Sequence, residues 1–542
     1  MNKKNIALVF IVLAALIAGL LIGNIIAYRN LQFGDKFAIG NWTNFGHFSR
    51  FDQLLQLIDR HYIDSIDIDE LSDQAAAEMI AQLDPHSVFI SAKDLEDVNS
   101  ELGGSFSGIG VQFNIQNDTI MIISVISGGP SEKVGLVAGD RIVLVDDSVF
   151  TGRSITNEKV MKSLRGQAGT LVKLGIRRSN SKDLLEFTIT RGQIPVKSID
   201  ISYMIEPGIG LIRVNKFGEQ TYSEFLTAIA SLRAQGALRF IIDLRENSGG
   251  FLDRAIMMIN EFLPARQLIV YTEGKAYPRV NSYSDGTGSC INKPIVVLID
   301  EFSASASEIF AGAIQDNDRG LVIGRRSFGK GLVQQQKVLF DGSAVRLTVA
   351  RYYTPSGRSI QRPYVRGQSD EYNQDIWNRF LHGEFDNKDS IQFNDTLTYK
   401  TASGRTVFGG GGIMPDIFVP RDTAAFTPWF NRVNNFMHLH QFAFSFTDIN
   451  RTELSKFRDW QSLEQHLDKQ NLLSQFVTYT SQKGINPVQS EINRSSSLVL
   501  NRLKAFISRN ILGDDGFYPI LFKEDNTVKR AVKEIRNLGS SI

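Results

Sequence analysis

The sequence predicts a multidomain α/β protein with a β-rich module in its first half and a helical region at its end. The chain has 542 residues, of which 42% are hydrophobic, so it can form several domains of ordinary size. Short strand-like runs with glycine turns dominate residues 104–192, whereas longer apolar runs alternate with helical patterns over residues 193–362. Such alternation is typical of a mixed sheet covered by helices.

The composition excludes several classes of protein. Basic and acidic residues number 59 and 58, a net charge of +1, so we expect no nucleic-acid partner. A single cysteine, Cys290, rules out a disulfide scaffold and a cysteine-based metal site. The sequence contains neither H-E-x-x-H nor G-x-x-x-x-G-K-[ST]. We therefore expect neither a metal nor a cofactor.

Residues 1–28 predict a membrane signal anchor. Lys3 and Lys4 precede residues 6–27, a run without any charge that is long enough to cross a bilayer core of about 30 Å. A cleaved signal peptide would have a shorter apolar stretch followed by small residues. The positive flank predicts a single-pass protein of the inner (cytoplasmic) membrane, with the rest of the chain outside the cytoplasm, in the periplasm or cell envelope.

Residues 40–103 predict a helical segment. Apolar residues recur with a helical period from Phe51 to Ile58, and residues 69–83 repeat the pattern. Asp84 stands before Pro85, which disfavours a continuing helix, so His86 is expected in a turn.

Residues 104–192 form the β-rich module, with one clear helix expected at residues 156–166. In "SFSGIGVQF", two glycines leave backbone N–H groups uncovered before a strand. Such a loop can hold the C-terminal carboxylate of a peptide, or it can be a plain glycine turn. Together with "GLVAGDRIVLVDD" and "LRGQAGT", the module resembles a PDZ domain. The predicted tail-binding residues are Ser107, Gly108, Ile109, Gly110 and Val111, with the apolar pair lining a side-chain pocket.

Residues 193–435 form the α/β region, with strands expected at "RFIIDLR", "PIVVLID" and "RGLVIG" and helices between them. Residues 363–406 are polar and weakly patterned, and we interpret them as an insertion. Residues 436–542 are helical and rich in Gln and Asn.

The stretch "EFSASASEIFAGAIQD" carries serines at every second position before a helix. Ser305 and Glu308 have the spacing of a capping box, so this serine can be a structural cap. It can also be a nucleophile, because a helix N-terminus offers free N–H groups to the oxyanion formed by attack on a carbonyl.

A base for this serine is available at Lys330, between Gly329 and Gly331. Burial would have to lower its pKa from about 10.4 to near neutrality, and Gln334 could then hydrogen-bond the amine without adding charge. The alternatives are a solvated lysine and a Ser-His-Asp arrangement through His86. The sequence has no G-x-S-x-G elbow for the latter.

Several motifs, taken in order, resemble the C-terminal processing peptidases, or tail-specific proteases. They are "LDPHS", "FSGIGV", "DLRENSGG", "SASASEIFAGAIQD", "SFGKGLVQ" and "YTPSGRSIQ". The resemblance implies a crotonase-like α/β protease core with a PDZ domain in front. One departure is that residues 363–406 separate "GRSIQ" from the G-x-x-P-D-I element at residues 412–417.

The resemblance also implies roles for individual residues. Ser305 is then the nucleophile, Lys330 the base and Gln334 the residue that orients the base. The implied oxyanion donors are the backbone N–H groups of Ala306 and of Gly249 or Gly250. Asp316 is an accessory candidate, since an aspartate there affects activity in some relatives, but it can equally cap a helix.

The sequence therefore predicts a membrane-anchored serine endopeptidase of the cell envelope. Its expected partners are protein substrates with apolar C-terminal tails, and a homo-oligomer or an adaptor protein is compatible with the sequence. Two alternatives stay open: a Ser-Lys hydrolase of wall peptides, which leaves the PDZ-like module unexplained, and a catalytically idle PDZ scaffold.

Overall fold

A computed structural model describes residues 45–538, except residues 117, 179–180 and 393–395. The chain divides into two units, residues 1–75 and 76–542. The predicted anchor, residues 1–28, lies outside the described residues. Among the helices that are described, none is long and apolar enough to cross a membrane.

The predicted helical segment contains three helices and one short strand. Asp84 ends the run, since its carboxylate accepts the N–H groups of His86 and Ser87, both at 2.9 Å, and thereby closes the expected turn. The elements are α2 (Phe45–His61), α3 (Ile68–Ala81), β1 (Val88–Ile90) and α4 (Leu95–Leu102).

The β-rich module is a six-stranded antiparallel sheet of order β3-β4-β5-β7-β8, with β6 beside β5. Strands β2 (Ser105–Gly108) and β9 (Gly192–Pro195) pair at its entry and exit. The other elements are β3 (Val111–Gln116), β4 (Thr119–Val125), α5 (Pro130–Lys133), β5 (Arg141–Val145), β6 (Ser148–Val149), α6 (Asn157–Leu164), β7 (Leu171–Arg177) and β8 (Leu185–Thr190).

The α/β region is built on a second six-stranded sheet of order β10-β11-β12-β15-β16-β21. Only β10 and β11 are antiparallel, and each further pair is parallel, as buried apolar strands joined by helices predict. The strands are β10 (Ile199–Glu206), β11 (Ile209–Val214), β12 (Arg239–Asp243), β15 (Ile295–Ile299), β16 (Leu321–Gly324) and β21 (Ile417–Phe418).

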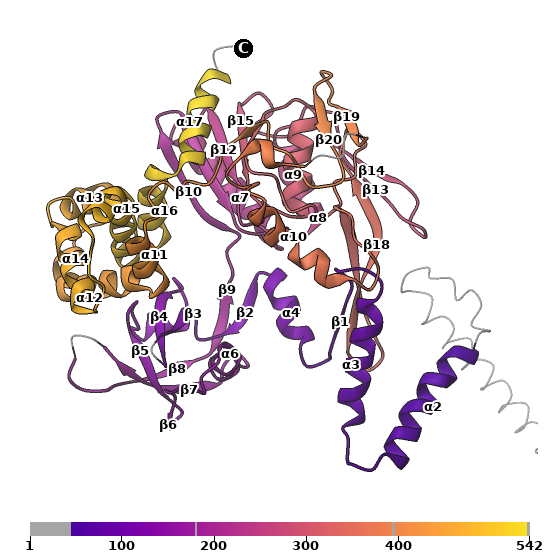
Figure 1. Cartoon of the computed structure of the whole chain (residues 1–542), viewed down its shortest axis with the longest axis horizontal. Coiled ribbons are helices and arrows are strands. Elements are labelled where there is room, and N and C mark those ends of the chain that lie inside the picture. Colours follow the sequence, from indigo (N-terminus) through magenta and orange to yellow (C-terminus); the bar gives the residue numbers. More distant parts are fainter. Residues whose placement is uncertain (1–44, 117, 179–180, 393–395, 539–542) are drawn as a thin grey trace, which may run out of the picture. The chain divides into compact units, whose positions relative to one another are not determined.

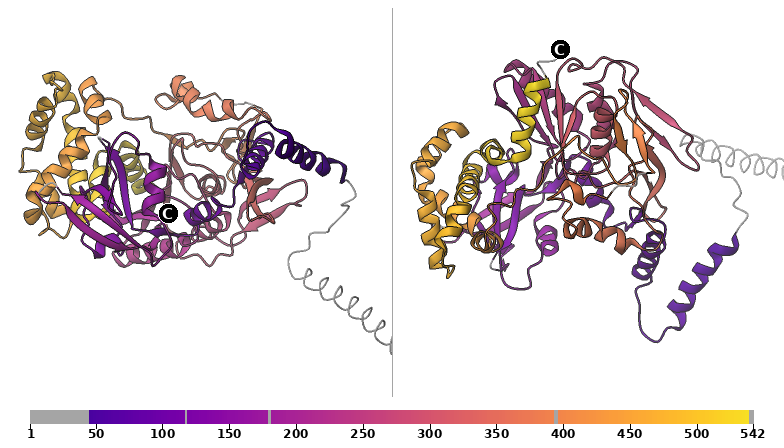
Figure 2. Two further views of the ribbon diagram at one scale, coloured as in Figure 1. Left: turned by 90° about the horizontal axis from the view of Figure 1, so that it is seen from below. Right: turned by 45° about the horizontal axis from the view of Figure 1, so that its top comes forward.

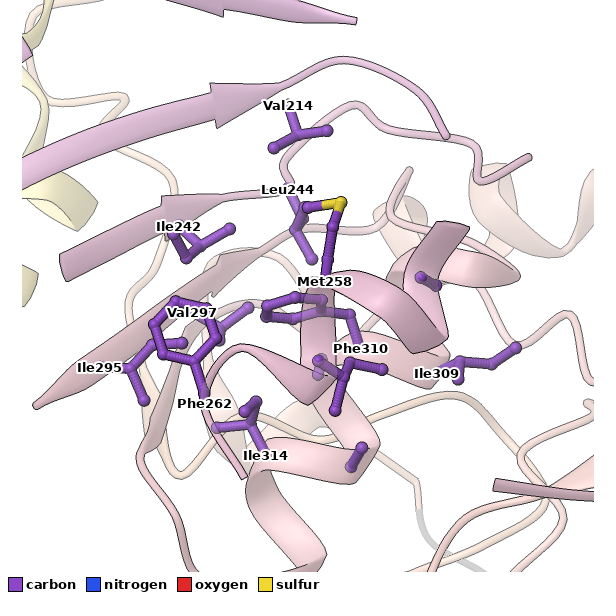
Figure 3. Close-up of a cluster of buried hydrophobic side chains, with 14 of the residues drawn as sticks. Val214, Ile242, Leu244, Met258, Phe262, Ile295, Val297, Ile309, Phe310 and Ile314 are labelled. Carbon is purple, nitrogen blue, oxygen red and sulfur yellow. The ribbon is translucent and has the colours of Figure 1, made fainter. Parts of the chain in front are cut away.

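One face of this sheet packs on three helices, α7 (Thr221–Ala234), α8 (Leu252–Asn260) and α9 (Ala306–Asp316). Figure 3 shows part of this apolar core, where Ile242 and Val297 of the sheet face Phe262 and Phe310. Every residue of α9 is buried, so the end of α9 is held rigidly.

The opposite face is covered by the last described helix. Val528, Ala531 and Ile535 of α17 (Asn526–Leu538) pack against sheet residues such as Leu211 and Val296. Figure 1 shows this yellow helix along β12 and β15, and Figure 2 shows it in two further views. The sheet is therefore covered on one face by helices of the α/β region and on the other face by a helix from the end of the chain.

A five-stranded antiparallel sheet has the order β1-β18-β13-β14, with β17 beside β18. The loop that carries Lys330 leads into β17. Strand β1 comes from the N-terminal segment, which brings the 84–87 turn close to β18. The remaining strands are β13 (Leu268–Glu273), β14 (Val280–Tyr283), β17 (Leu332–Val338) and β18 (Ala344–Tyr353).

The insertion is more regular than its sequence pattern predicts. It contains α10 (Ser369–Leu381), the short helix η1 (Lys388–Ser390) and the hairpin of β19 (Thr398–Lys400) and β20 (Thr406–Phe408). The chain then returns to the main sheet, because the N–H of Gly412 donates to the carbonyl of Ile360 at 2.8 Å and β21 pairs with β16.

The C-terminal helices have an apolar core of their own, which includes Trp429, Phe442 and Phe476. They are α11 (Pro428–Asn435), α12 (His438–Leu454), α13 (Trp460–Leu467), α14 (Leu472–Gln482), α15 (Gln489–Leu512), α16 (Asp514–Leu521) and η2 (Phe522–Glu524).

Candidate active site

The three serines before α9 have different environments. Ser303 and Ser307 are fully buried, and their hydroxyls donate to the carbonyls of Leu244 (2.8 Å) and Asn247 (2.9 Å). Ser305 is only partly buried, and its φ of +54° is a strained conformation for a residue with a Cβ. Of the three hydroxyls, that of Ser305 is the one placed to meet a substrate.

The "NSGG" loop lies directly against Ser305. A Cβ on Gly249 would come within 2.8 Å of the Cβ of Ser305 and 3.0 Å of the backbone N of Ala306, so only glycine fits there. The N–H of Gly249 donates to Oδ1 of Asn247 at 2.8 Å. Gly250 follows with φ +141°, and in the part of the chain that the structure describes its N–H has no recorded acceptor.

Asp300 joins this loop to the serine loop. Its Oδ1 accepts the N–H of Glu246 at 2.9 Å and the N–H of Ser303 at 3.1 Å. A direct backbone bond adds to this, from the N–H of Ala304 to the carbonyl of Asn247 at 3.0 Å. The two loops therefore form one rigid unit. Nothing in the sequence pattern singled out Asp300.

Lys330 lies just before β17 and is partly buried. Nζ donates to Oε1 of Gln334 at 2.9 Å, the contact expected from their spacing. Burial lowers the pKa of Lys330, and the nearby positive charge of Arg346 lowers it further. Such an amine is easier to deprotonate than a solvated lysine.

Glu308 and Tyr352 hold the serine and the lysine in a fixed relation. Oε2 of Glu308 accepts the N–H of Ser305 at 2.8 Å and the N–H of Lys330 at 2.9 Å. The hydroxyl of Tyr352 lies within hydrogen-bonding reach of the carbonyl of Ser305, at 3.1 Å, and of the carbonyl of Lys330. Glu308 was expected only as a helix cap, and the sequence did not single out Tyr352.

The carboxyl of Glu308 is completely buried and makes no ion pair in the described residues. Its other oxygen accepts the N–H of Gly329 at 2.7 Å and the hydroxyl of Ser327. Loss of hydration raises its pKa to about 7, although these donors act in the opposite direction.

His86 reaches the site through its backbone and its ring. Its carbonyl accepts from Nε2 of Gln334, and its Nε2 lies 2.8 Å from the hydroxyl of Tyr372. Burial is the main cause that lowers the pKa of His86, to about 4, so the ring is neutral at pH 7. Because Tyr372 occupies Nε2, a Ser-His-Asp arrangement finds no support.

An open pocket of about 560 Å³ lies beside these groups. Its walls combine a lysine, a histidine, a glutamate and a serine with apolar side chains. The lining residues are His86, Glu246, Ser248, Phe302, Ala304, Phe328 and Lys330.

Asp316 lies at the other end of α9 from Ser305. Its carboxylate pairs with the guanidinium of Arg358 at 2.7 Å, and both side chains are fully buried. It also accepts the hydroxyl of Ser356 at 2.7 Å. These contacts brace the "SGR" loop.

In the β-rich module, the predicted tail-binding loop runs from β2 into β3. The side chain of Ile109 is buried in the core of the module, whereas Val111 is partly buried. The hydroxyl of Ser107 is buried and has no hydrogen-bond partner among the described residues. Gly108 faces the end of α6, since a Cβ on it would lie 3.5 Å from the carbonyl of Leu164.

No group of three His, Cys, Asp or Glu side chains in the described ranges could hold a metal ion.

Comparison with known proteins gives three family matches. Residues 208–368 match peptidase family S41, residues 107–189 match the PDZ domain and residues 429–513 match a family of unknown function. The chain is 38% identical over 318 residues to the carboxy-terminal-processing protease of Bartonella bacilliformis, covering 58% of this chain and 72% of that protein. It is 34% identical over 367 residues to the carboxy-terminal processing protease CtpA of Bacillus subtilis, covering 68% and 77%. Among solved structures, the photosystem II D1 C-terminal processing protease is 24% identical, with a TM-score of 0.36, over 69% of this chain and 93% of that one.

Proposed function

Because the chain belongs to peptidase family S41, among the carboxy-terminal processing serine proteases with a PDZ domain, we propose that it cleaves proteins with Ser305 as nucleophile and Lys330 as base. The observation that carries this proposal is the shared carboxylate of Glu308, which binds the backbones of both residues. Of the three serines before α9, only Ser305 combines partial exposure with a strained backbone.

In this mechanism the neutral amine of Lys330 takes the proton of Ser305 while Oγ attacks the scissile carbonyl. Gln334 accepts one N–H of the amine, which leaves the lone pair free for that proton. The N–H of Ala306, at the positive end of α9, and the N–H of Gly250 stabilise the oxyanion. Lys330 then returns the proton to the leaving amine. Water hydrolyses the resulting ester by the same route.

The PDZ domain would select substrates by their C-terminal residue. Backbone N–H groups of the 107–111 loop would bind the carboxylate, and the buried, unpartnered hydroxyl of Ser107 lies in this loop. We also propose the domain limits predicted from the sequence. Residues 1–28 would anchor the chain in the membrane and so place it in the cell envelope. Retention of the chain in the membrane fraction, lost when residues 1–28 are deleted, would support that location.

The test is a set of serine variants assayed on one peptide, made with a free and with an amidated C-terminus. We expect Ser305→Ala to remove nearly all cleavage, roughly a thousandfold or more. Ser303→Ala and Ser307→Ala, each leaving a small buried gap, should keep most activity per folded molecule. The intact enzyme should cleave the amidated peptide more slowly, and its rate should rise with pH as the amine of Lys330 loses its proton.

Two results would contradict different parts of the proposal. A folded Ser303→Ala or Ser307→Ala protein as inactive as Ser305→Ala would refute the nucleophile. Equal rates on the free-acid and amidated peptides would refute tail selection but leave the Ser305 chemistry intact.

A further inference from the structure

The insertion between β18 and β21 contacts the histidine next to the proposed base. The family match ends at residue 368, and α10 begins at Ser369, so this helix lies outside the matched segment. Tyr372 on α10 is only 4% exposed, and its ring meets that of His86 edge-on, with centroids 5.0 Å apart. A polar insertion has no evident need to bury a tyrosine against the active-site turn.

The phenol of Tyr372 is fixed on several sides. Its hydroxyl lies 2.8 Å from Nε2 of His86 and 3.3 Å from Nε2 of Gln361. The guanidinium of Arg362 lies over its ring at 3.7 Å, and over the ring of Phe328 at 4.0 Å. Since Phe328 and His86 both line the pocket, Tyr372 supports one wall of it from behind.

His86 in turn determines how Gln334 faces the lysine. Its carbonyl accepts from Nε2 of Gln334, so Oε1 of Gln334 must face Nζ of Lys330. With the amide reversed, its NH₂ would donate to the lone pair of the amine. That lone pair is the one that has to take the serine proton, so a reversed amide would block the base.

We propose that Tyr372 is a positioning residue for the base and acts on Lys330 through His86 and Gln334. The inference rests on the proposed Ser305–Lys330 chemistry. Asp84 fixes the backbone of the 84–87 turn from one side, and Tyr372 fixes the ring of His86 from the other. The insertion thereby makes the orientation of Gln334 depend on a segment that the family match does not include.

The charges around the amine give the direction of the pH effect. Burial and Arg346 lower the pKa of Lys330, whereas Glu308 and Asp84 raise it. His86 is neutral, and it lies close enough to Lys330 that the charge of the lysine lowers the pKa of His86. Loosening the His86 turn would let water reach the amine, raise its pKa and shift the rising limb of the rate to higher pH.

The experiment compares Tyr372→Phe with Tyr364→Phe in the full chain. Tyr372→Phe keeps the ring contacts and removes only the hydroxyl. Tyr364 is a matched control, because its ring packs 6.4 Å from that of Tyr372 without a recorded hydrogen bond in the described residues. The probe is a short internally quenched peptide with an apolar, free-acid C-terminus, assayed across neutral and alkaline pH.

For Tyr372→Phe we expect kcat to fall about threefold to tenfold, the cost of one hydrogen bond. KM should change less than twofold, the rising limb should move to higher pH, and the melting midpoint should match that of Tyr364→Phe. The role of Tyr372 would be overturned if kcat and the rising limb of the pH–rate profile were unchanged. It would also be overturned if Tyr364→Phe lost as much kcat, or if the loss of kcat only followed a lower melting midpoint. Lys330→Ala separates the two proposals, because activity in that variant would refute the proposed function itself.

Discussion

Helix α9 carries a buried carboxylate at each end, and the two are satisfied in different ways. Asp316, at the C-terminal end, faces the full positive charge of Arg358 at 2.7 Å. Glu308, at the N-terminal end, is surrounded by N–H and O–H donors, and its pKa is raised to about 7. The first arrangement is a brace. The second holds two backbones together through a carboxyl whose raised pKa keeps it partly protonated near pH 7; in its charged form it raises the pKa of Lys330.

The largest expected effect is the loss of stability when the pair of Asp316 and Arg358 is broken. Asp316→Asn should lower the free energy of unfolding by roughly 3–5 kcal/mol, because it leaves the guanidinium of Arg358 buried without a counter-charge. Chemical denaturation of the full chain measures this loss, with Asp318→Asn, a more exposed aspartate nearby, as the control. A loss below about 1 kcal/mol would show that the pair is not a brace.

Glu308, at the N-terminal end of α9, should make the stability of the fold depend on pH. In the unfolded chain the carboxyl of Glu308 loses its proton near pH 4.5, whereas in the folded protein it keeps the proton up to about pH 7. Between these pH values the folded state binds more protons than the unfolded state. The contribution of Glu308 to stability is therefore complete below pH 4.5 and is lost as the pH rises to about 7. The loss is at most about 3 kcal/mol.

Melting midpoints of the wild type and Glu308→Gln at both ends of this range isolate the effect. The midpoint of the wild type relative to the variant should fall as the pH rises. The comparison with the variant is needed because His86, whose pKa is lowered to about 4, makes stability rise over part of the same range. A constant difference would mean that Glu308 is charged throughout.

The smallest effect concerns catalysis at pH 7. Glu308→Gln keeps one acceptor oxygen but turns an NH₂ towards N–H donors, so we expect Ser305 and Lys330 to be held less well. A loss of kcat of about tenfold, close to 1.4 kcal/mol, should follow, with KM nearly unchanged. Steady-state kinetics measure it, and Asp316→Asn, corrected for its folded fraction, should lose less. The reverse order would refute the division of roles.

The sequence predicted the elements that rest on periodic apolar patterns. The runs at residues 239–245 and 294–300 are parallel strands, and the serine stretch opens a helix. The PDZ domain and the α/β protease core were likewise expected from their motifs. These segments follow local apolar patterns, which a sequence displays directly.

What the sequence did not show depends on long-range contacts. Residues 363–406 read as a polar insertion, yet α10 forms there and buries Tyr372 against His86. Glu308 read as a capping residue, yet its carboxylate also binds the backbone of Lys330, 22 residues away. Tyr352 lies within reach of the carbonyls of Ser305 and Lys330 only because β17 and β18 pair. Such roles arise when the fold joins distant segments, and no local spacing records them.

The position of α17 has a consequence for how the chain is made. The sheet face that it covers begins with β10 near residue 199, but Val528, Ala531 and Ile535 are synthesised more than 300 residues later. Until then, a growing chain already holds the serine, the lysine and both loops, while one face of the central sheet still exposes Leu211, Val296 and their neighbours to water. This face of the protease core can therefore be buried only after α17 has been synthesised, so folding of the core is completed late.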